Sequence, residues 1–218
     1  SELDSGFVSA SIITIVFGVL FFLSNLDHDR SIDLPQAFIL TALSWLSIAI
    51  FGSLPFIFSE LNLTFTDAFF ESMSGITTTG STILTDIDNT QKGILLWRAI
   101  LQWLGGIGII LMAITLMPIM NIGGMQLFKI SSNDNAEKIL PKSKEVSLRL
   151  IAIYSLLTLV CAIFYKLFGM SYFDSLTHSM TTIATGGFSN YNDSIGHFNS
   201  ALIEINAIIF IILGSIPF

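Results

Sequence analysis

The chain has 218 residues, of which 52% are hydrophobic and only 11% carry a charge. A soluble domain has about 25% charged residues, so this composition and a mean hydropathy of +0.77 indicate an integral membrane protein. The net charge of −7 and the few basic residues argue against nucleic-acid binding, and no soluble-enzyme motif such as GxSxG or HExxH occurs. We expect an all-α membrane protein that is not an enzyme.

Five apolar runs predict membrane-spanning helices, because about 20 helical residues cross the hydrocarbon core of a bilayer. They cover residues 7–26, 34–59, 93–120, 148–170 and 201–218. The first run could also be a secretory signal peptide. However, the acidic residues Glu2 and Asp4 precede it, and no small-residue cleavage site follows it. We therefore interpret it as a span.

The charges are unevenly distributed, and this distribution predicts the orientation in the membrane. Five of the nine basic residues lie in one stretch between the third span and the first residues of the fourth, at Lys129, Lys138, Lys142, Lys144 and Arg149. The positive-inside rule places that loop in the cytoplasm. Residues 60–91 and 171–204 contain acidic residues and neither Lys nor Arg. Both segments are expected to face outward and to attract cations.

One stretch of the sequence occurs twice. DAFFESMSGITTTGS begins at Asp67 and returns in altered form as DSLTHSMTTIATGGF at Asp174, an offset of 107 residues. Each copy predicts a short helix, at 65–76 and 173–183, and then a Thr/Gly turn, at 77–82 and 184–190. The expected helix caps are Thr64 or Thr66 in the first copy and Ser171 in the second. Helices this short cannot span a bilayer, so the sequence predicts two parallel helix–pore loop–helix repeats around an ion path.

The Thr/Gly turns are candidate selectivity filters, in which backbone carbonyls replace the hydration shell of a monovalent cation. The residues expected to form them are Thr78, Thr79 and Gly80 in the first repeat, and Thr185, Gly186 and Gly187 in the second. Thr77, Glu71 and Arg98 are the candidate residues for supporting the filter. A Ser/Thr/Gly-rich surface turn, or small residues that only let helices pack closely, would be the simpler reading. The recurrence in the same helix–turn context favours the filter.

Two polar residues near the turns, Arg98 and His178, have more than one possible role. Arg98 could extend its side chain to the membrane interface, or it could pair with Glu71 or a neighbouring carbonyl. His178 replaces Glu71 in the second copy, where a structural hydrogen bond is favoured over pH sensing. The mid-span glycines, Gly105, Gly106 and Gly108, are expected to allow close helix packing.

Several segments resemble the bacterial Trk-type potassium uptake subunits of the Trk/Ktr/HKT superfamily. They are FGSLPFIFSE (51–60), TDAFFESMSGITTTGST (66–82), QWLGGIGII (102–110), NIGGMQL (121–127) and ATGGFSNYNDSIGHF (184–198). The resemblance covers nearly the whole chain and implies four pore-loop repeats around one K⁺ path. The chain would then hold an accessory helix and loop (1–33), a first repeat (34–120), a cytoplasmic loop (121–147) and a second repeat (148–218). Repeats three and four would be absent.

The resemblance also implies the ion, the partners and the location. K⁺ would be the transported ion, bound at Thr78, Thr79, Thr185 and Gly186, with no organic cofactor. The partners would be membrane lipid, a second copy in a homodimer, and a cytosolic nucleotide-binding regulatory subunit of the TrkA type that could contact the 121–147 loop. The location would be the bacterial inner membrane.

Two alternatives remain open on sequence grounds. The chain could be a non-conducting scaffold or receptor whose Thr/Gly turns only pack, or an intramembrane enzyme that uses Asp174 and His178. Because two repeats cannot close a ring around an ion, we expect the native chain to continue beyond Phe218 or further copies to complete the ring.

Overall fold

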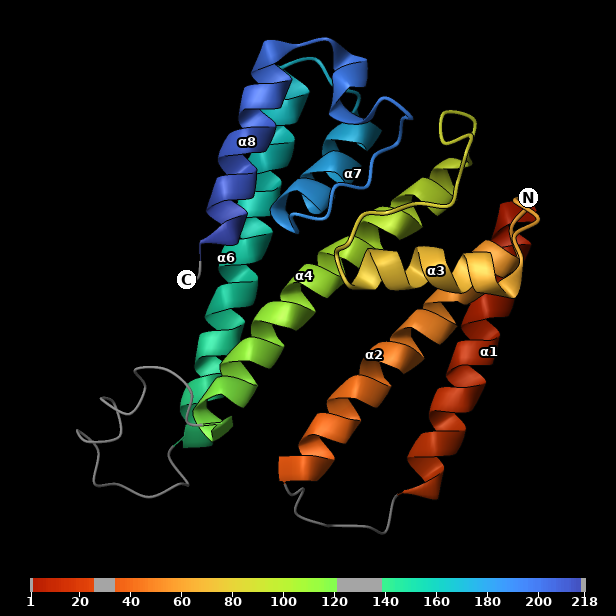
Figure 1. Cartoon of the computed structure of the whole chain (residues 1–218), viewed down its shortest axis with the longest axis vertical. Helices are drawn as coiled ribbons and strands as arrows, with labels where there is room; N and C mark the ends of the chain where they lie inside the picture. The colour runs from red at the N-terminus through yellow and green to blue at the C-terminus, as the bar shows by residue number, and fades with distance from the viewer. Residues whose placement is uncertain (1, 26–33, 121–138, 217–218) are drawn as a thin grey trace.

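The computed structural model describes residues 2–25, 34–120 and 139–216, and all regular elements in these residues are helical (Figure 1). They are α1 (Glu2–Ser24), α2 (Leu34–Ile57), α3 (Phe65–Ile76), α4 (Lys92–Met120), α6 (Ile139–Leu167), α7 (Tyr172–Ile183), the 3₁₀ helix η2 (Ser194–Phe198) and α8 (Ala201–Ser215). The all-α fold is confirmed. The predicted loop 27–33 and residues 121–138 of the predicted cytoplasmic loop lie outside the described residues.

Four helices in the described part are long and apolar enough to cross a membrane. The segments are Ser5–Ser24, Pro35–Ile57, Lys92–Met112 and Glu145–Leu167, with mean hydropathies from 1.8 to 2.4. They confirm four of the five predicted spans. The fifth, predicted at 201–218, is apolar, but α8 has 15 residues. That is fewer than the roughly 20 residues needed to cross a bilayer.

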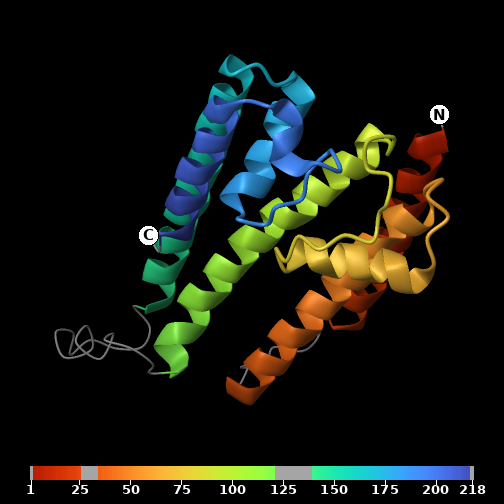
Figure 2. The same cartoon turned by 45° about the horizontal axis from the view of Figure 1, so that its top comes forward.

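The helices form two similar groups on either side of α4 (Figures 1 and 2). In the first, α3 contacts α2 and α4, and α1 packs along α2. In the second, α7 contacts α6 and α8. Helix α4 belongs to the first group by sequence but also contacts α6 and α7 of the second. It is therefore the element that joins the two repeats.

Each repeat buries its own apolar core, while its outer faces remain apolar. Cys161, Tyr165 and Phe210 belong to the core between α6, α7 and α8, and Phe56 and Leu101 to the core of the first repeat. Large apolar side chains on the outer faces of the four candidate spans and of α8 are exposed, among them Phe21, Phe22, Leu43, Leu156, Leu202 and Ile208. An apolar surface of this extent suits contact with lipid chains.

The two short helices begin in the same way. Thr64 and Ser171 are the N-caps, and their hydroxyl oxygens accept hydrogen bonds from the amides of Asp67 (3.2 Å) and Asp174 (3.1 Å). The hydroxyls also donate to the carboxylates of the same aspartates, at 2.7 and 2.6 Å. Thr64 rather than Thr66 is therefore the cap of α3, and Ser171 is the cap of α7 as predicted. Both helices end at the predicted residues, and α7 starts one residue earlier than predicted.

Replacement of Thr64 by alanine is expected to destabilise the protein by about 1 kcal/mol, because the cap bond to Asp67 is lost. Thermal unfolding of the purified protein in detergent measures this change. Thr66→Ala is the matched control, since Thr66 is an exposed residue inside α3. Equal destabilisation by both variants would contradict the assignment of the cap.

Candidate selectivity filter

The predicted turns share an unusual backbone conformation. We call residues 77–82 the first filter segment and residues 184–190 the second. Thr78 and Thr185 are left-handed, with φ of 55° and 53°, and Gly80 and Gly187 both have φ of 79°. Positive φ is rare for a β-branched residue, and strained backbone of this kind persists only where the surrounding structure imposes it. Because it recurs at matching positions, the two segments share the same backbone conformation there.

The backbone amides at the start of each filter segment are bound by the end of the preceding short helix. Thr78 and Thr79 donate to the carbonyls of Gly75 and Ser74, at 2.9 and 3.0 Å. The matching bonds in the second repeat run from Thr185 to Thr182 (3.0 Å) and from Gly186 to Thr181 (2.9 Å). These amides at the start of both segments are therefore used locally, and the carbonyl oxygens beside them are candidate ligands.

Most of the predicted ligand oxygens accept no hydrogen bond within the described part of the chain. Among the described residues, no hydrogen bond is donated to the carbonyls of Thr78, Thr79, Gly80, Thr185 or Gly187. Gly186 departs from this pattern, because its oxygen accepts a hydrogen bond from Gln102 Nε2 at 2.9 Å. A carbonyl oxygen has two lone pairs, so Gln102 occupies one of the two at this predicted K⁺ ligand.

The hydroxyl groups of Thr77 and Ser74 connect the first filter segment to α3 by hydrogen bonds. The Thr77 hydroxyl donates to the Met73 carbonyl (2.7 Å) and lies 2.8 Å from the Thr79 hydroxyl. Ser74 donates to the Ser81 carbonyl at 2.5 Å. These bonds tie the segment to α3 and place Thr77 where a supporting residue is expected.

Glu71 and His178 occupy the same place in the two repeats and use different chemistry. Both Glu71 oxygens lie 3.0 Å from the Thr82 hydroxyl, and one also accepts from the Ile83 amide at 3.0 Å. In the second repeat His178 Nε2 lies 3.0 Å from the hydroxyl of Ser189, the counterpart of Thr82. Each side chain anchors its filter segment to its short helix, so His178 has the structural role that the sequence favoured.

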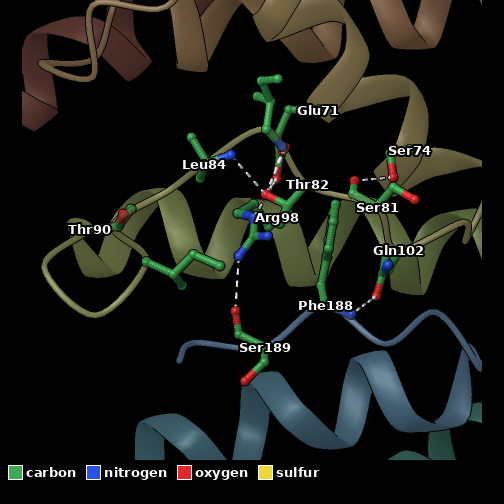
Figure 3. Close-up of polar contacts among 12 residues, drawn as sticks. Glu71, Ser74, Ser81, Thr82, Leu84, Thr90, Arg98, Gln102, Phe188 and Ser189 are labelled. Atoms are coloured by element: carbon green, nitrogen blue, oxygen red, sulfur yellow. Dashed lines mark hydrogen bonds and ion pairs between the residues drawn. The ribbon is translucent and has the colours of Figure 1, made fainter. Parts of the chain in front are cut away.

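Arg98 of α4 contacts both repeats at once (Figure 3). Its side chain is almost fully buried, and its Nε lies 2.7 Å from Glu71 Oε1. Its NH1 group donates to the Ser189 carbonyl at 2.9 Å, and its guanidinium lies 4.1 Å from the centre of the Phe188 ring. The structure therefore resolves the open choice for Arg98 in favour of pairing, with Glu71 and with a carbonyl of the second filter segment.

The mid-span glycines of α4 lie where helices pass each other closely. A Cβ atom on Gly105 would overlap the carbonyl of Ile76, the last residue of α3, and one on Gly106 would overlap the Tyr154 hydroxyl. Gly214 of α8 lies in the same way against the carbonyl of Ile183, the last residue of α7. The packing role predicted for Gly105 and Gly106 is confirmed, and Gly105 and Gly214 are equivalent positions.

The outer loops of the two repeats are also joined. Asn192 donates to the Asp88 carboxylate at 2.6 Å and accepts from the Ile87 amide at 3.3 Å. Tyr191 donates to the Asp174 carboxylate at 3.2 Å, and partial burial together with the Asp174 charge raises the pKa of Tyr191. Tyr191 therefore remains a donor, and the second filter segment is fixed at its outer end.

The structure does not join the side chains of Asp174 and His178, the pair considered for the enzyme alternative, by a hydrogen bond. The His178 ring contacts the backbone carbonyl of Asp174 (3.0 Å), while the Asp174 carboxylate is held by Ser171, Asn190 and Tyr191. The two side chains therefore do not form an acid–base pair. The described residues also contain no group of three or more His, Cys, Asp or Glu side chains that could hold a metal ion.

One residue of the site, Gln102, was not singled out by sequence reasoning. It is fully buried, donates to the Gly186 carbonyl and accepts from the Phe188 amide at 3.1 Å (Figure 3). Its signal in the sequence is its position four residues after Arg98. Two polar residues at this spacing lie on one face of a helix, and such residues inside a span are expected to face protein rather than lipid.

Comparison with known proteins shows the family to which the chain belongs. The TrkH family profile, described as a cation transport protein, matches residues 4–218. The Trk system potassium uptake protein TrkI of Halomonas elongata is 44% identical over 185 residues, covering 84% of this chain and 37% of that protein. The potassium uptake protein TrkH of Escherichia coli K12 is 41% identical over 213 residues, covering 95% of this chain and 44% of that protein.

A solved structure gives the same result. The crystal structure of the potassium transporter TrkH from Vibrio parahaemolyticus superposes with a TM-score of 0.85 at 36% identity, covering 97% of this chain and 42% of that chain. The chain thus spans less than half the length of the relatives it matches. The apolar spans of the chain and this similarity together identify a multi-pass protein of the bacterial inner membrane. The chain belongs to the TrkH family of cation transport proteins.

Proposed function

We propose that the chain forms about half of the wall of a K⁺ path, with the two filter segments as its ion-binding surface. The observation that carries this proposal is the matched backbone of the two segments, left-handed at Thr78 and Thr185 and again at Gly80 and Gly187. This conformation recurs next to carbonyl oxygens that accept no hydrogen bond from the described residues. A packing turn would not require such oxygens to remain free.

The chemistry of the segments favours a monovalent cation. The proposed ligands are backbone oxygens of Thr78, Thr79 and Gly80, and of Thr185, Gly186 and Gly187, with Gly186 shared with Gln102. Backbone oxygens suit a hard cation. Helices α3 and α7 end at the segments and direct the negative ends of their dipoles there. The Glu71 charge beside the first filter segment is balanced by Arg98, so this pair adds no net negative charge that would favour a divalent ion.

The wider assembly follows from the proposed path. Two filter segments do not enclose an ion, so further pore-loop repeats or further chains would complete the ring. The relatives are named potassium uptake proteins of the Trk system, and we extend to this chain K⁺ as the transported ion. We likewise propose a homodimer with a TrkA-like cytosolic nucleotide-binding subunit, for which the 121–147 loop would supply contacts.

Transport by the complete protein that carries this sequence tests the proposal. Its expression in bacterial cells lacking K⁺ uptake systems is expected to restore growth at low K⁺ concentration and to give K⁺-dependent uptake. A vector without the gene is the control. A protein that reaches the membrane but restores neither growth nor uptake would favour the alternative, a scaffold or receptor whose Thr/Gly turns only pack.

A further inference from the structure

Gln102 connects the first repeat to the ion-binding segment of the second. It lies on α4, its side chain is fully buried, and its amide group makes two hydrogen bonds to the second filter segment. We propose that Gln102 is a positioning residue that fixes the backbone from Gly186 to Phe188 and thereby determines the selectivity of the path for K⁺ over Na⁺. This inference rests on the proposed function of the filter segments.

The two hydrogen bonds fix the orientation of the peptide groups they contact. Nε2 donates to the Gly186 oxygen at 2.9 Å, and Oε1 accepts from the Phe188 amide at 3.1 Å. A primary amide carries its donors on nitrogen and its acceptor on a separate oxygen, so one uncharged side chain can bind a carbonyl and an amide at the same time. Because Gln102 holds both ends of the Gly186–Phe188 stretch, the peptide groups between them cannot rotate independently. Selectivity in filters depends on the number and field strength of the carbonyls that face the ion.

The sequence of the second filter segment matches this contact. A Cβ atom on Gly186 would overlap the Gln102 side-chain amide. Gly186 is not among the residues with positive φ, so its backbone conformation does not itself require glycine. The first repeat has Thr79, a residue with a Cβ atom, at the equivalent position. The extra glycine in Thr185-Gly186-Gly187 is therefore explained by Gln102 and not by the turn.

Among the described residues, α8 of the second repeat has no side chain that makes the equivalent contact. Gly105 and Gly214 are equivalent positions. Three residues before them lie Gln102 and Ile211, and seven residues before them lie Arg98 and Ala207. The side chains of Ile211 and Ala207 are apolar and cannot form hydrogen bonds. They line a cavity of about 120 Å³ beside the second filter segment. Gln102 of the first repeat therefore fixes the second filter segment, and Ile211 and Ala207 provide no matching contact from the second repeat.

Two variants of the complete protein test the inference in liposomes loaded with K⁺ or Na⁺. Gln102→Met keeps the approximate side-chain size and removes both hydrogen bonds. It is expected to lower the ratio of K⁺ to Na⁺ flux by about tenfold, the factor for one or two lost buried hydrogen bonds. Gln36→Met is the matched control, because Gln36 is exposed at the start of α2. It is expected to leave the ratio unchanged.

A double substitution separates positioning from folding. Gly186→Ala alone is expected to reduce K⁺ flux strongly, because its methyl group meets Gln102. Gly186→Ala combined with Gln102→Ala removes that overlap and is expected to recover K⁺ flux but not selectivity. Both proteins are checked for a monodisperse state in detergent. A purely structural role for Gln102 would lower flux and yield equally and leave the flux ratio unchanged.

The outcomes also distinguish this inference from the proposed function. If the native protein shows no K⁺-dependent flux, the proposed function itself fails. If the native protein prefers K⁺ and Gln102→Met keeps the native flux ratio, only the inference about Gln102 is overturned. An unrecovered flux in the double variant would contradict the explanation given for Gly186.

Discussion

Replacement of Arg98 by methionine is expected to destabilise the protein by about 3–5 kcal/mol, because the Glu71 carboxylate would be left buried without its countercharge. The same change removes the hydrogen bond to the Ser189 carbonyl, which joins the two repeats. Transport should therefore be lost together with folded protein. The measurements are the fraction of protein that stays monodisperse after heating in detergent and the rate of K⁺ uptake.

An exposed ion pair in the same chain supplies the matched control. Arg149 pairs with Glu145 at 2.6 Å, with side-chain exposures of 74% and 64%. Arg149→Met is expected to cost no more than about 0.5 kcal/mol, as for other exposed helix pairs. Combining Arg98→Met with Glu71→Gln should be less destabilising than Arg98→Met alone, since no unpaired charge remains. A double variant as unstable as the single one would contradict the assigned ion pair.

The second large effect is expected for Gly80→Ala, which should abolish K⁺ uptake. Two independent obstacles meet at this position. The backbone has φ of 79°, which costs an L-residue about 1–2 kcal/mol. In addition, an added Cβ would overlap the carbonyl oxygen of Gly186 in the opposite filter segment. The methyl group would therefore separate the two segments at the proposed ion site.

Gly187→Ala provides the comparison, because Gly187 has the same φ of 79° but open space where a Cβ would lie. It is expected to retain measurable K⁺ uptake, reduced only by the cost of the backbone conformation. The rates are compared after correction for the amount of protein in the membrane. Equal loss of uptake in both variants would show that conformation alone matters and that the contact across the segments does not.

Local features of the fold could be predicted from the sequence with good accuracy. The short helix 65–76 has the predicted bounds, because its cap, its amphipathic pattern and the following Thr/Gly turn all lie within one stretch of chain. The repeat itself predicted that Thr185 and Gly187 would match Thr78 and Gly80, and their backbone angles agree within a few degrees. Composition alone was sufficient for the membrane class.

Contacts between the repeats could not be predicted in the same way. The sequence left two partners open for Arg98 and did not identify Gln102, although both residues lie on one face of an apolar helix. Which carbonyl each side chain meets depends on how α4 passes α7, and no local pattern in the chain encodes that crossing. The prediction for Gly186 as a ligand likewise could not anticipate that Gln102 binds its oxygen.

The proposed function requires that backbone carbonyls of the two filter segments select K⁺. The most direct test is the ratio of K⁺ to Na⁺ flux in liposomes containing the complete protein, compared between the native sequence and Gly187→Ala. The native protein should favour K⁺, and the variant should show a reduced ratio because its filter backbone is strained at that position. An unchanged ratio in a variant that still conducts would contradict the account.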